Sequence, residues 1–527
     1  MKGRMKRLSA LVLAVTLAFG MVGCGSSGSE SESADSGKTH ITVGYNALLT
    51  SLSPFQSDSP AFVSFQYDVL ETLFRRSEED AMVLEPQIGE SYEQIDDEGY
   101  SWEVKIKDYV HDSEGNDITA SDVVFSMRQL EESGFGVYYG YNNIQNLEVV
   151  DDYTFQVTLG SNEDQAIEQF LMYCPIISEK AFNESSDSMA SDLVATGPYK
   201  VKEFISGSSL TLELNENYWE TDDSKKCWLS QSNVDEIECV YIEENSQLEV
   251  ALETGEIDAA PSIATSSLSQ FEDDENYAIT EMPATSVFAL IISGDESSPT
   301  SDLRVRQAIA YAIDQQGLID AVYEGHATKS NFEMVALDDY QEQWADEVYY
   351  EYDPEKAAEK LKEAGYEPGE LKLKFITSGT GVPLAELCEI YLEDAGFDIT
   401  VEQLELAMYQ STLLKPEEYN IGMTYVGMTS NAVSYAARFD ARKNNGRSLE
   451  GYEDEEMQKL IEAASKRGHT EEELDELHRY MNENVMDYPM LTLNNVDIYR
   501  TDCGLEELVY EANNYPMYHA STYSWNK

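Results

Sequence analysis

The chain has 527 residues, of which 100 are acidic and 34 basic, and its formal net charge at pH 7 is −66. This charge argues against nucleic acid as a partner, because long-range repulsion opposes every contact with a phosphate. A hydrophobic content of 42%, with 11% aromatic residues, excludes a disordered acidic tail. The length and composition therefore predict a folded, very acidic protein of two to four domains.

The first residues have the pattern of a secretory signal. A basic cluster of Lys2, Arg4, Lys6 and Arg7 precedes an uncharged apolar run over residues 8–19. This run is too short to cross a bilayer as a helix, which needs about 20 residues. It predicts export of the chain and not a membrane-spanning segment.

The apolar run leads into Met-Val-Gly-Cys at residues 21–24, which resembles the lipobox of bacterial lipoproteins, with Met21 in place of the more usual Leu. The resemblance implies that residues 1–23 are a lipoprotein signal peptide and that Cys24 is lipidated; an ordinary signal peptide is the alternative. Residues 24–37 are rich in Gly and Ser after the cysteine and predict a flexible tether. Loss of the four basic residues would change the net charge from −66 to −70. We expect a body outside the cytoplasm that is anchored to the bacterial membrane by lipid alone.

The remaining cysteines do not indicate a disulfide framework or a zinc site. Five cysteines remain after Cys24, so they cannot all pair, and no two of them form a C-x-x-C motif. Cys227 and Cys239 could form a bridge if the chain between them folds back, but lone buried thiols are the commoner outcome. The five residues are Cys174, Cys227, Cys239, Cys388 and Cys503.

Strand-like segments dominate the first part of the body. Alternating runs at residues 100–107 and 154–159 predict half-buried strands. Between them, a polar turn precedes a helix that begins at Thr119 and carries Asp122 in its first turn, as in a capping box. Further strand-like runs occupy residues 197–204, 209–215 and 235–242, followed by a helix that ends at Gly255.

The second part of the body alternates strands and helices. An apolar run at residues 287–292 precedes a predicted helix over residues 302–323, which would leave Arg304, Arg306 and Gln307 outside the core. Asp353 followed by proline announces another helix, which Gly365 ends. Strand-like runs at 371–377, 398–404 and 420–428, with a helix at 384–395, then predict an α/β lobe with a partly parallel sheet.

No motif of an enzyme is present. The chain lacks H-E-x-x-H, G-x-S-x-G and the phosphate-binding glycine loops, and we expect neither catalysis nor a cofactor. A surface-anchored hydrolase remains the alternative, because paired carboxylates for glycoside chemistry are recognised by distance. His469 and His478 are the only histidines near each other in the sequence, and we interpret both as surface residues. The scattered histidines, which argue against a nickel site, are His40, His111, His326, His469, His478 and His519.

The order of these segments resembles the extracytoplasmic solute-binding proteins of ATP-binding-cassette (ABC) importers for peptides and nickel, known as family 5. This resemblance implies an α/β, two-lobed periplasmic-binding-protein-like fold (type II, large), with an additional domain inserted in the first lobe. The ligand would be enclosed between the lobes of a monomer, and membrane permease subunits would recognise the closed protein. The segments that carry the resemblance are residues 89–130, 195–204, 210–219, 234–260, 302–331 and 352–366.

The resemblance also implies the domain boundaries. The chain would cross between the lobes near residues 287–292 and 489–495. Lobe I would comprise residues 38–80 and 196–285, the inserted domain 81–195, lobe II 286–489, and the return to lobe I 490–527.

In peptide-binding relatives, a G-W-x-x-D-Y run follows the strand that corresponds to residues 420–428, and its aspartate pairs with the α-ammonium group of the peptide. Here Met428 replaces the Trp and Asn431 the Asp. A neutral amide accepts a hydrogen bond but supplies no ion pair. The ligand residues that we predict are Tyr45 and Asn46 on the near wall, and Tyr425, Met428, Asn431 and Tyr435 on the far wall.

The ligand expected first is an oligopeptide. An oligosaccharide or another non-peptide solute is the alternative, since the 34 tyrosines offer stacking surfaces. Core positions in a strand are the competing interpretation of Tyr425 and Met428. An adhesin or a signalling receptor of the same fold is a third possibility for the whole chain.

Overall fold

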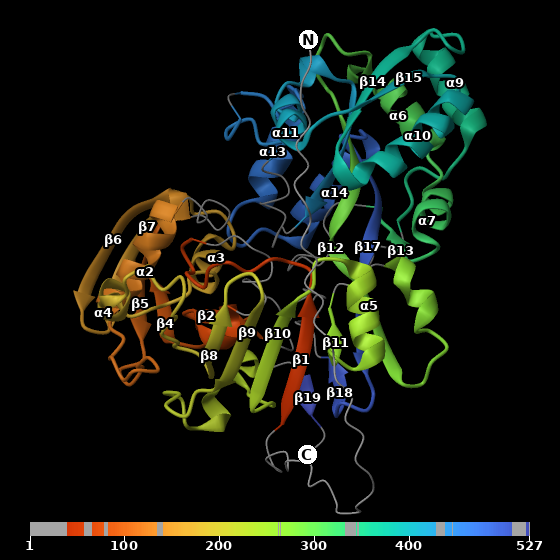
Figure 1. Cartoon of the computed structure of the whole chain (residues 1–527). Helices are drawn as coiled ribbons and strands as arrows, with labels where there is room; N and C mark the ends of the chain where they lie inside the picture. The colour runs from red at the N-terminus through yellow and green to blue at the C-terminus, as the bar shows by residue number, and fades with distance from the viewer. Residues whose placement is uncertain are drawn as a thin grey trace, which may run out of the picture. The chain divides into compact units, whose positions relative to one another are not determined.

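The computed structural model describes residues 39–56, 66–77, 83–133, 141–261, 263, 265–331, 344, 347–427, 438–444, 446–508 and 523–525. Its main feature is an 11-stranded mixed sheet (Figure 1). In order across the sheet, the strands are β15 (Asp398–Gln403), β14 (Lys372–Thr377), β16 (Ile421–Gly427), β12 (Tyr277–Ile292), β17 (Asp487–Arg500), β11 (Ala259–Ala260), β1 (His40–Tyr45), β10 (Glu236–Tyr241), β9 (Ser209–Leu214) and β8 (Tyr199–Ile205), and β13 (Ala327–Lys329) pairs with β17.

The sheet has two groups of parallel strands, which antiparallel pairs separate. β1 is parallel to β10 and β11, and β14 is parallel to β15 and β16. Helices connect many of these strands, as parallel pairing requires. The partly parallel α/β architecture expected from the sequence is confirmed. Helices outside the inserted domain include α5 (Asn245–Thr254), α6 (Leu303–Ala312), α7 (Gln315–Tyr323), α9 (Pro354–Ala364), α10 (Val382–Asp394), α11 (Leu406–Leu413), α13 (Glu455–Ala464) and α14 (Glu471–Glu483).

The inserted domain is built on a separate antiparallel sheet, which Figure 1 shows on the left. Trp102, Val104 and Ile106 of β5 are buried and alternate with more exposed residues, as the sequence predicts. Thr119 precedes the first helix and donates its hydroxyl to Asp122 Oδ2 at 2.7 Å. The elements are β4 (Gly89–Gln94), β5 (Ser101–Ile106), β7 (Thr154–Leu159), β6 (Ile144–Asp151), α2 (Ala120–Ser133), α3 (Ala166–Met172) and α4 (Glu179–Glu184). Two short pairs, β2 (Phe74–Arg76) with β3 (Leu84–Pro86) and β18 (Leu505–Leu508) with β19 (Tyr523–Trp525), complete the strands.

Local capping signals place helix ends correctly. Gly255 ends α5 with φ 72°, and Gly365 ends α9 with φ 96°, a backbone region that favours glycine. Asp353 caps α9 by accepting a hydrogen bond from Lys356 N at 2.9 Å.

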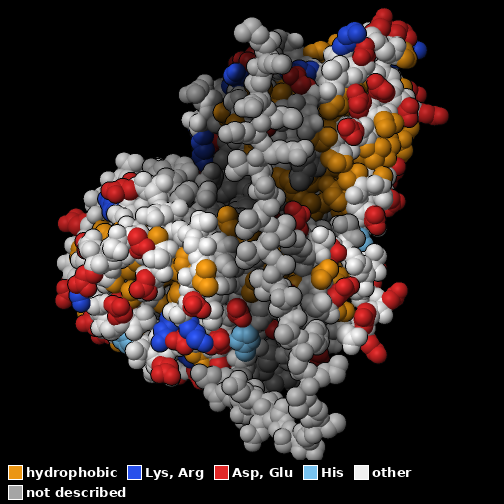
Figure 2. Space-filling view, in the orientation of Figure 1, with side chains coloured by type: hydrophobic (Ala, Val, Ile, Leu, Met, Phe, Trp, Pro, Cys, Tyr) orange, Lys and Arg blue, Asp and Glu red, His pale blue; other side chains and the backbone are white. Residues whose placement is uncertain are grey.

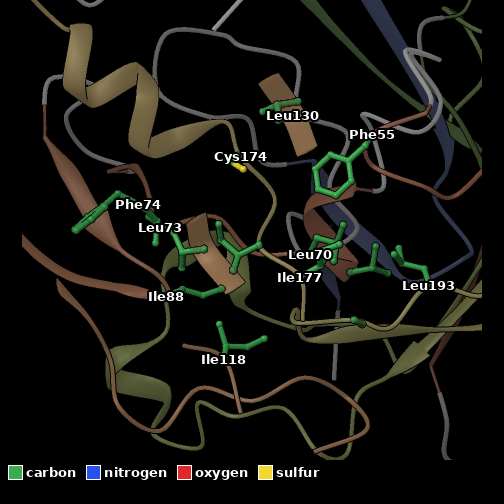
Figure 3. Close-up of a cluster of buried hydrophobic side chains, with 14 of the residues drawn as sticks. Phe55, Leu70, Leu73, Phe74, Ile88, Ile118, Leu130, Cys174, Ile177 and Leu193 are labelled. Atoms are coloured by element: carbon green, nitrogen blue, oxygen red, sulfur yellow. The ribbon is translucent and has the colours of Figure 1, made fainter. Parts of the chain in front are cut away.

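The hydrophobic cores follow the lobes. One buried cluster joins the sheet of lobe I to the inserted domain, and Figure 3 shows part of it around Leu70, Leu73 and Ile88. Separate clusters in lobe II lie under α6 and α10 and between α13 and α14. Acidic side chains are scattered over the parts of the visible face that are drawn in colour, whereas Lys and Arg form a few small groups (Figure 2).

The four cysteines Cys174, Cys227, Cys239 and Cys388 are buried free thiols, and the half-buried Cys503 donates its thiol to Arg500 O at 2.9 Å. The expectation of lone thiols is therefore confirmed. No helix among the described residues is long and apolar enough to cross a membrane.

The predicted continuous helix over residues 302–323 is wrong. α6 ends at Ala312, and Ile313 is extended with ψ 118°. Asp314 then begins α7 as an N-cap, accepting a hydrogen bond from Gly317 N at 3.0 Å. A side chain that caps a new helix satisfies early amides, so the chain can break and turn without losing hydrogen bonds.

Two side chains predicted at the surface are buried. Arg306 is only 5% exposed, and its guanidinium donates to the carbonyl oxygens of Thr300, Ser301 and Asn484 at 2.8–3.1 Å. Arg304 is exposed and Gln307 half-buried. His478 is 2% exposed and stacks on an indole ring instead of facing solvent.

Candidate functional site

Two long strands, β12 and β17, run from lobe I into lobe II. Residues 277–283 of β12 pair with 494–500 of β17 in lobe I, and residues 287–291 pair with 487–492 in lobe II. The register shifts between Pro283 and Val287, and we call this section the crossing. These strands bring the loops of the two lobes to a common place.

In each lobe, strands run toward the crossing and have their carboxyl ends there. β11 is antiparallel to β17 and parallel to β1, so β1 and β10 run in the direction of β12, toward lobe II. β16 is antiparallel to β12 and ends with Gly427 opposite Ser286. Loops at the carboxyl ends of strands are where α/β proteins present groups to ligands. The loops after Tyr45 and after Gly427 therefore form the candidate site.

The near-wall residues lie at the end of β1. Tyr45 is 8% exposed, and its ring lines an apolar hollow of about 280 Å³, including the part open to solvent, with Leu49, Leu210 and Cys239 among its other walls. Asn46 is exposed and donates from Nδ2 to Asn245 Oδ1, at the start of α5, at 3.1 Å. At the end of β1, the Tyr45 ring is thus packed into lobe I, whereas the Asn46 amide lies at the surface.

The far-wall residues begin at the end of β16. Tyr425 is 40% exposed, and its ring centroid lies 3.9 Å from that of Phe288 on β12. Desolvation raises the pKa of Tyr425 above its ordinary value, and its hydroxyl is a hydrogen-bond donor at neutral pH. Met428, Asn431 and Tyr435 lie outside the described residues.

An ionic anchor that was not predicted from the sequence lies at Arg438, where the described chain resumes after β16. Arg438 Nη2 lies 2.7 Å from both Glu450 Oε1 and Asp487 Oδ2, and the two carboxylates are buried. Asp487 begins β17, and its Oδ1 accepts a hydrogen bond from Ile292 N, at the end of β12, at 3.3 Å. Arg438 therefore ties its segment to β17, and Asp487 links this ion pair to β12. One feature of the sequence could have indicated this anchor: Arg438 is a basic residue soon after the candidate loop, in a chain that has few basic residues.

The chemistry of the described residues at the site is that of binding. Hydroxyl, amide and aromatic groups offer hydrogen bonds and stacking. Among the described residues, no group of three or more His, Cys, Asp and Glu side chains could hold a metal ion.

Comparisons with known proteins agree with this architecture. A model of the family described as bacterial extracellular solute-binding proteins, family 5 Middle, matches residues 83–446. The oligopeptide-binding protein OppA of Bacillus subtilis (strain 168) is 24% identical over 493 residues, which cover 86% of this chain and 87% of OppA.

Solved structures share the fold. The oligopeptide-binding protein AppA from Bacillus subtilis, in complex with a nonapeptide, has a TM-score of 0.67 and 18% identity, covering 93% of this chain and 100% of AppA. NikZ from Campylobacter jejuni, in complex with Ni(L-His), has a TM-score of 0.69 and 19% identity, with the same coverage. The two-lobed α/β fold implied by the resemblance is thereby confirmed.

Proteins of this family work outside the cytoplasm, where they bind small ligands and cooperate with ABC permeases. The relatives found are solute-binding proteins and not enzymes, which supports a non-enzymatic role. Because the family model matches well over half of the sequence, the chain belongs to the bacterial extracellular solute-binding proteins of family 5.

Proposed function

We propose that this protein captures an oligopeptide between its two lobes and delivers it to an ABC importer while it is anchored to the membrane through lipidated Cys24. The observation that carries the proposal is the convergence of the carboxyl ends of β1 and β16 at the crossing. Peptide as the ligand class is supported by the similarity to OppA over 86% of the chain. The anchor rests on the lipobox-like residues 21–24, and release of a Cys24→Ser variant from the membrane fraction tests it.

The proposed ligand residues are Tyr45, Asn46, Tyr425, Met428, Asn431 and Tyr435. Asn431 distinguishes this protein from relatives with aspartate at that position, because an amide cannot form an ion pair with a peptide α-ammonium group. We therefore propose that a free amino terminus contributes little to binding here. The many acidic residues would favour neutral or cationic peptides.

Thermal-shift and calorimetric titration with matched peptides, each with a free and an N-acetylated amino terminus, test this proposal. A tight ligand at about 100 times its Kd adds roughly 2.7 kcal/mol of stability, which gives a clear shift. We expect the protein to bind both forms with similar affinity. Asn431→Asp should strengthen binding of the free-amine form by about tenfold, the effect of one favourable charge interaction of roughly 1.4 kcal/mol.

Asn217→Asp is the matched control, because Asn217 is an exposed asparagine of lobe I, outside the proposed ligand residues. Tight binding by the native protein that N-acetylation abolishes would contradict the role given to Asn431. Stabilisation by oligosaccharides or by a nickel–histidine complex, but by no peptide, would favour the alternative ligand class. Turnover of peptides or glycosides would overturn a binding-only function.

A further inference from the structure

The inserted domain meets lobe II along a seam of opposite charge. The inserted domain contributes acidic residues just before and within α3, and lobe II contributes basic residues from the segment that precedes α13 and from the turn directly after it. Because basic residues are outnumbered by 100 to 34 in this chain, three basic side chains paired with one acidic segment are a marked concentration. We call this contact the seam. Its charged members are Glu163 and Glu168 on one side and Arg442, Lys443 and Arg467 on the other, and Asp164 and Lys466 join it through their backbone.

The centre of the seam is the ion pair of Arg467 with Glu168. Both guanidinium nitrogens donate to the carboxylate, Nη1 to Oε2 at 3.0 Å and Nη2 to Oε1. The guanidinium also lies 4.9 Å from the ring centroid of Trp102 on β5. Glu168 is only 6% exposed, so loss of its partner would leave a carboxylate that water can hardly reach. A bidentate, partly desolvated pair of this kind is stronger than an exposed one.

Backbone contacts fix the register of the seam. Asp164 N donates to Ser465 O at 3.0 Å, and Glu163 forms an isolated antiparallel bridge with Lys466. Lys443 Nζ adds an ion pair with Glu163 Oε2 at 2.8 Å. Two segments paired through both backbone and side chains are docked specifically.

Apolar packing does not hold the seam. The inserted domain shares its buried cluster with lobe I, whereas α13 and α14 belong to a cluster within lobe II. In the part of the chain that the structure describes, no buried hydrophobic cluster spans both sides. Lobe II is joined to lobe I through β12 and β17, whose register shifts at the crossing. Charged contacts between separately packed bodies can open without exposing a core.

We propose that the seam is a reversible electrostatic latch by which lobe II docks on the inserted domain. The latch gives the inserted domain a role in closure, in addition to the two walls of the binding site. It goes beyond the proposed function and requires no particular solute, so its test uses no ligand.

Disulfide trapping in the full-length protein tests the latch. Partners in an antiparallel bridge have Cα atoms about 4.5–5.5 Å apart, within the range of a disulfide, so Glu163→Cys with Lys466→Cys reports docking. Cys24 and Cys503 are changed to Ser in this background, while the other cysteines are buried. We expect the disulfide to form readily in a glutathione redox buffer, followed by non-reducing electrophoresis and mass spectrometry.

Adding Glu168→Gln to this double-cysteine parent should slow trapping by about tenfold. About 1 M NaCl should also slow trapping in the double-cysteine parent itself, because salt screens the ion pairs. Glu131→Gln is the matched control: it breaks the Arg128–Glu131 pair in α2, outside the seam, and should leave the rate unchanged. The exchange of Glu168→Arg with Arg467→Glu should restore trapping if charge complementarity is the cause.

Absence of trapping in the parent would overturn the latch. So would a rate that neither Glu168→Gln nor salt changes. If Glu168→Gln fails to fold, as judged by thermal melting, the salt dependence of the parent decides the question. Failure of every peptide to bind would contradict the proposed function and leave this result standing.

Discussion

His478 lies buried against Trp344, with the ring centroids 4.2 Å apart and the planes within 7° of parallel. Its Nδ1 faces the Asn482 amide at 3.3 Å and accepts a hydrogen bond, which places the imidazole proton on Nε2, 3.6 Å from Glu347 Oε2. Burial lowers the pKa of His478 to about 4; Glu347 and Asp475 oppose this shift, and Arg479 adds to it.

The folded protein therefore takes up a proton on His478 at lower pH than the unfolded chain, whose histidine pKa is about 6.5. Between these values the unfolded chain binds more protons, so the free energy of unfolding falls as the pH falls from about 6.5 to 4. His478→Phe keeps the ring stack and removes the titration. We expect the parent to lose up to about 3 kcal/mol more than this variant between pH 7 and pH 4.

Urea unfolding at several pH values measures this difference. An identical loss of stability on acidification in the parent and in His478→Phe would contradict the assignment.

The residues placed wrongly from the sequence share one cause. Arg306 and His478 both lie in segments with a polar pattern, which predicts exposure. Their burial depends on partners far along the chain, such as the Asn484 carbonyl for Arg306 and the Trp344 ring for His478. No local pattern announces such a partner, whereas the glycines and caps that end α5 and α9 act on neighbouring residues and were predictable.

At the level of elements, the break between α6 and α7 depends on Asp314. Its side chain accepts the hydrogen bond from Gly317 N, which would otherwise be an orphan donor of the first turn. Asp314→Ala should lower the free energy of unfolding by about 1 kcal/mol, the usual contribution of an N-cap. Chemical denaturation with a fitted slope measures it.

Asp320→Ala provides the control within the same helix. Asp320 is exposed and contacts the Gln316 side chain, but it caps nothing. A change at Asp320 as large as that at Asp314 would show that charge on α7 matters and capping does not. The sequence pattern failed here because apolar spacing continued through Ile313, which hid the break.

The site was predictable only in part for a related reason. Strand polarity follows from alternation of strands and helices, so the loops after Tyr45 and Gly427 were identifiable as following the carboxyl ends of strands, where we propose that the ligand binds. The register shift between Pro283 and Val287 arises from pairing with a strand about 200 residues away, and it leaves no periodic signal. The acidic and basic sides of the seam are likewise about 300 residues apart, as the separation of 299 between Glu168 and Arg467 shows.

For the whole molecule, the net charge of −66 acts on stability as well as on partners. Acidic side chains are spread over the visible face without a matching number of bases (Figure 2). Their mutual repulsion favours expansion of the chain, and salt screens it over about 10 Å at 0.1 M. The seam is the opposite case, since its complementary charges attract one another and salt weakens them.

Raising NaCl from about 10 to 200 mM should therefore increase the Tm of the protein, by about 2–4 °C, because screening relieves repulsion throughout the folded body. Calorimetric melting measures this shift, and KCl at equal ionic strength should give the same increase if screening is the cause. A Tm that falls with salt would mean that attractive pairs such as Arg467–Glu168 outweigh the general repulsion. The same salt series should slow disulfide trapping across the seam, so global stability and docking of lobe II are expected to respond to ionic strength with opposite signs.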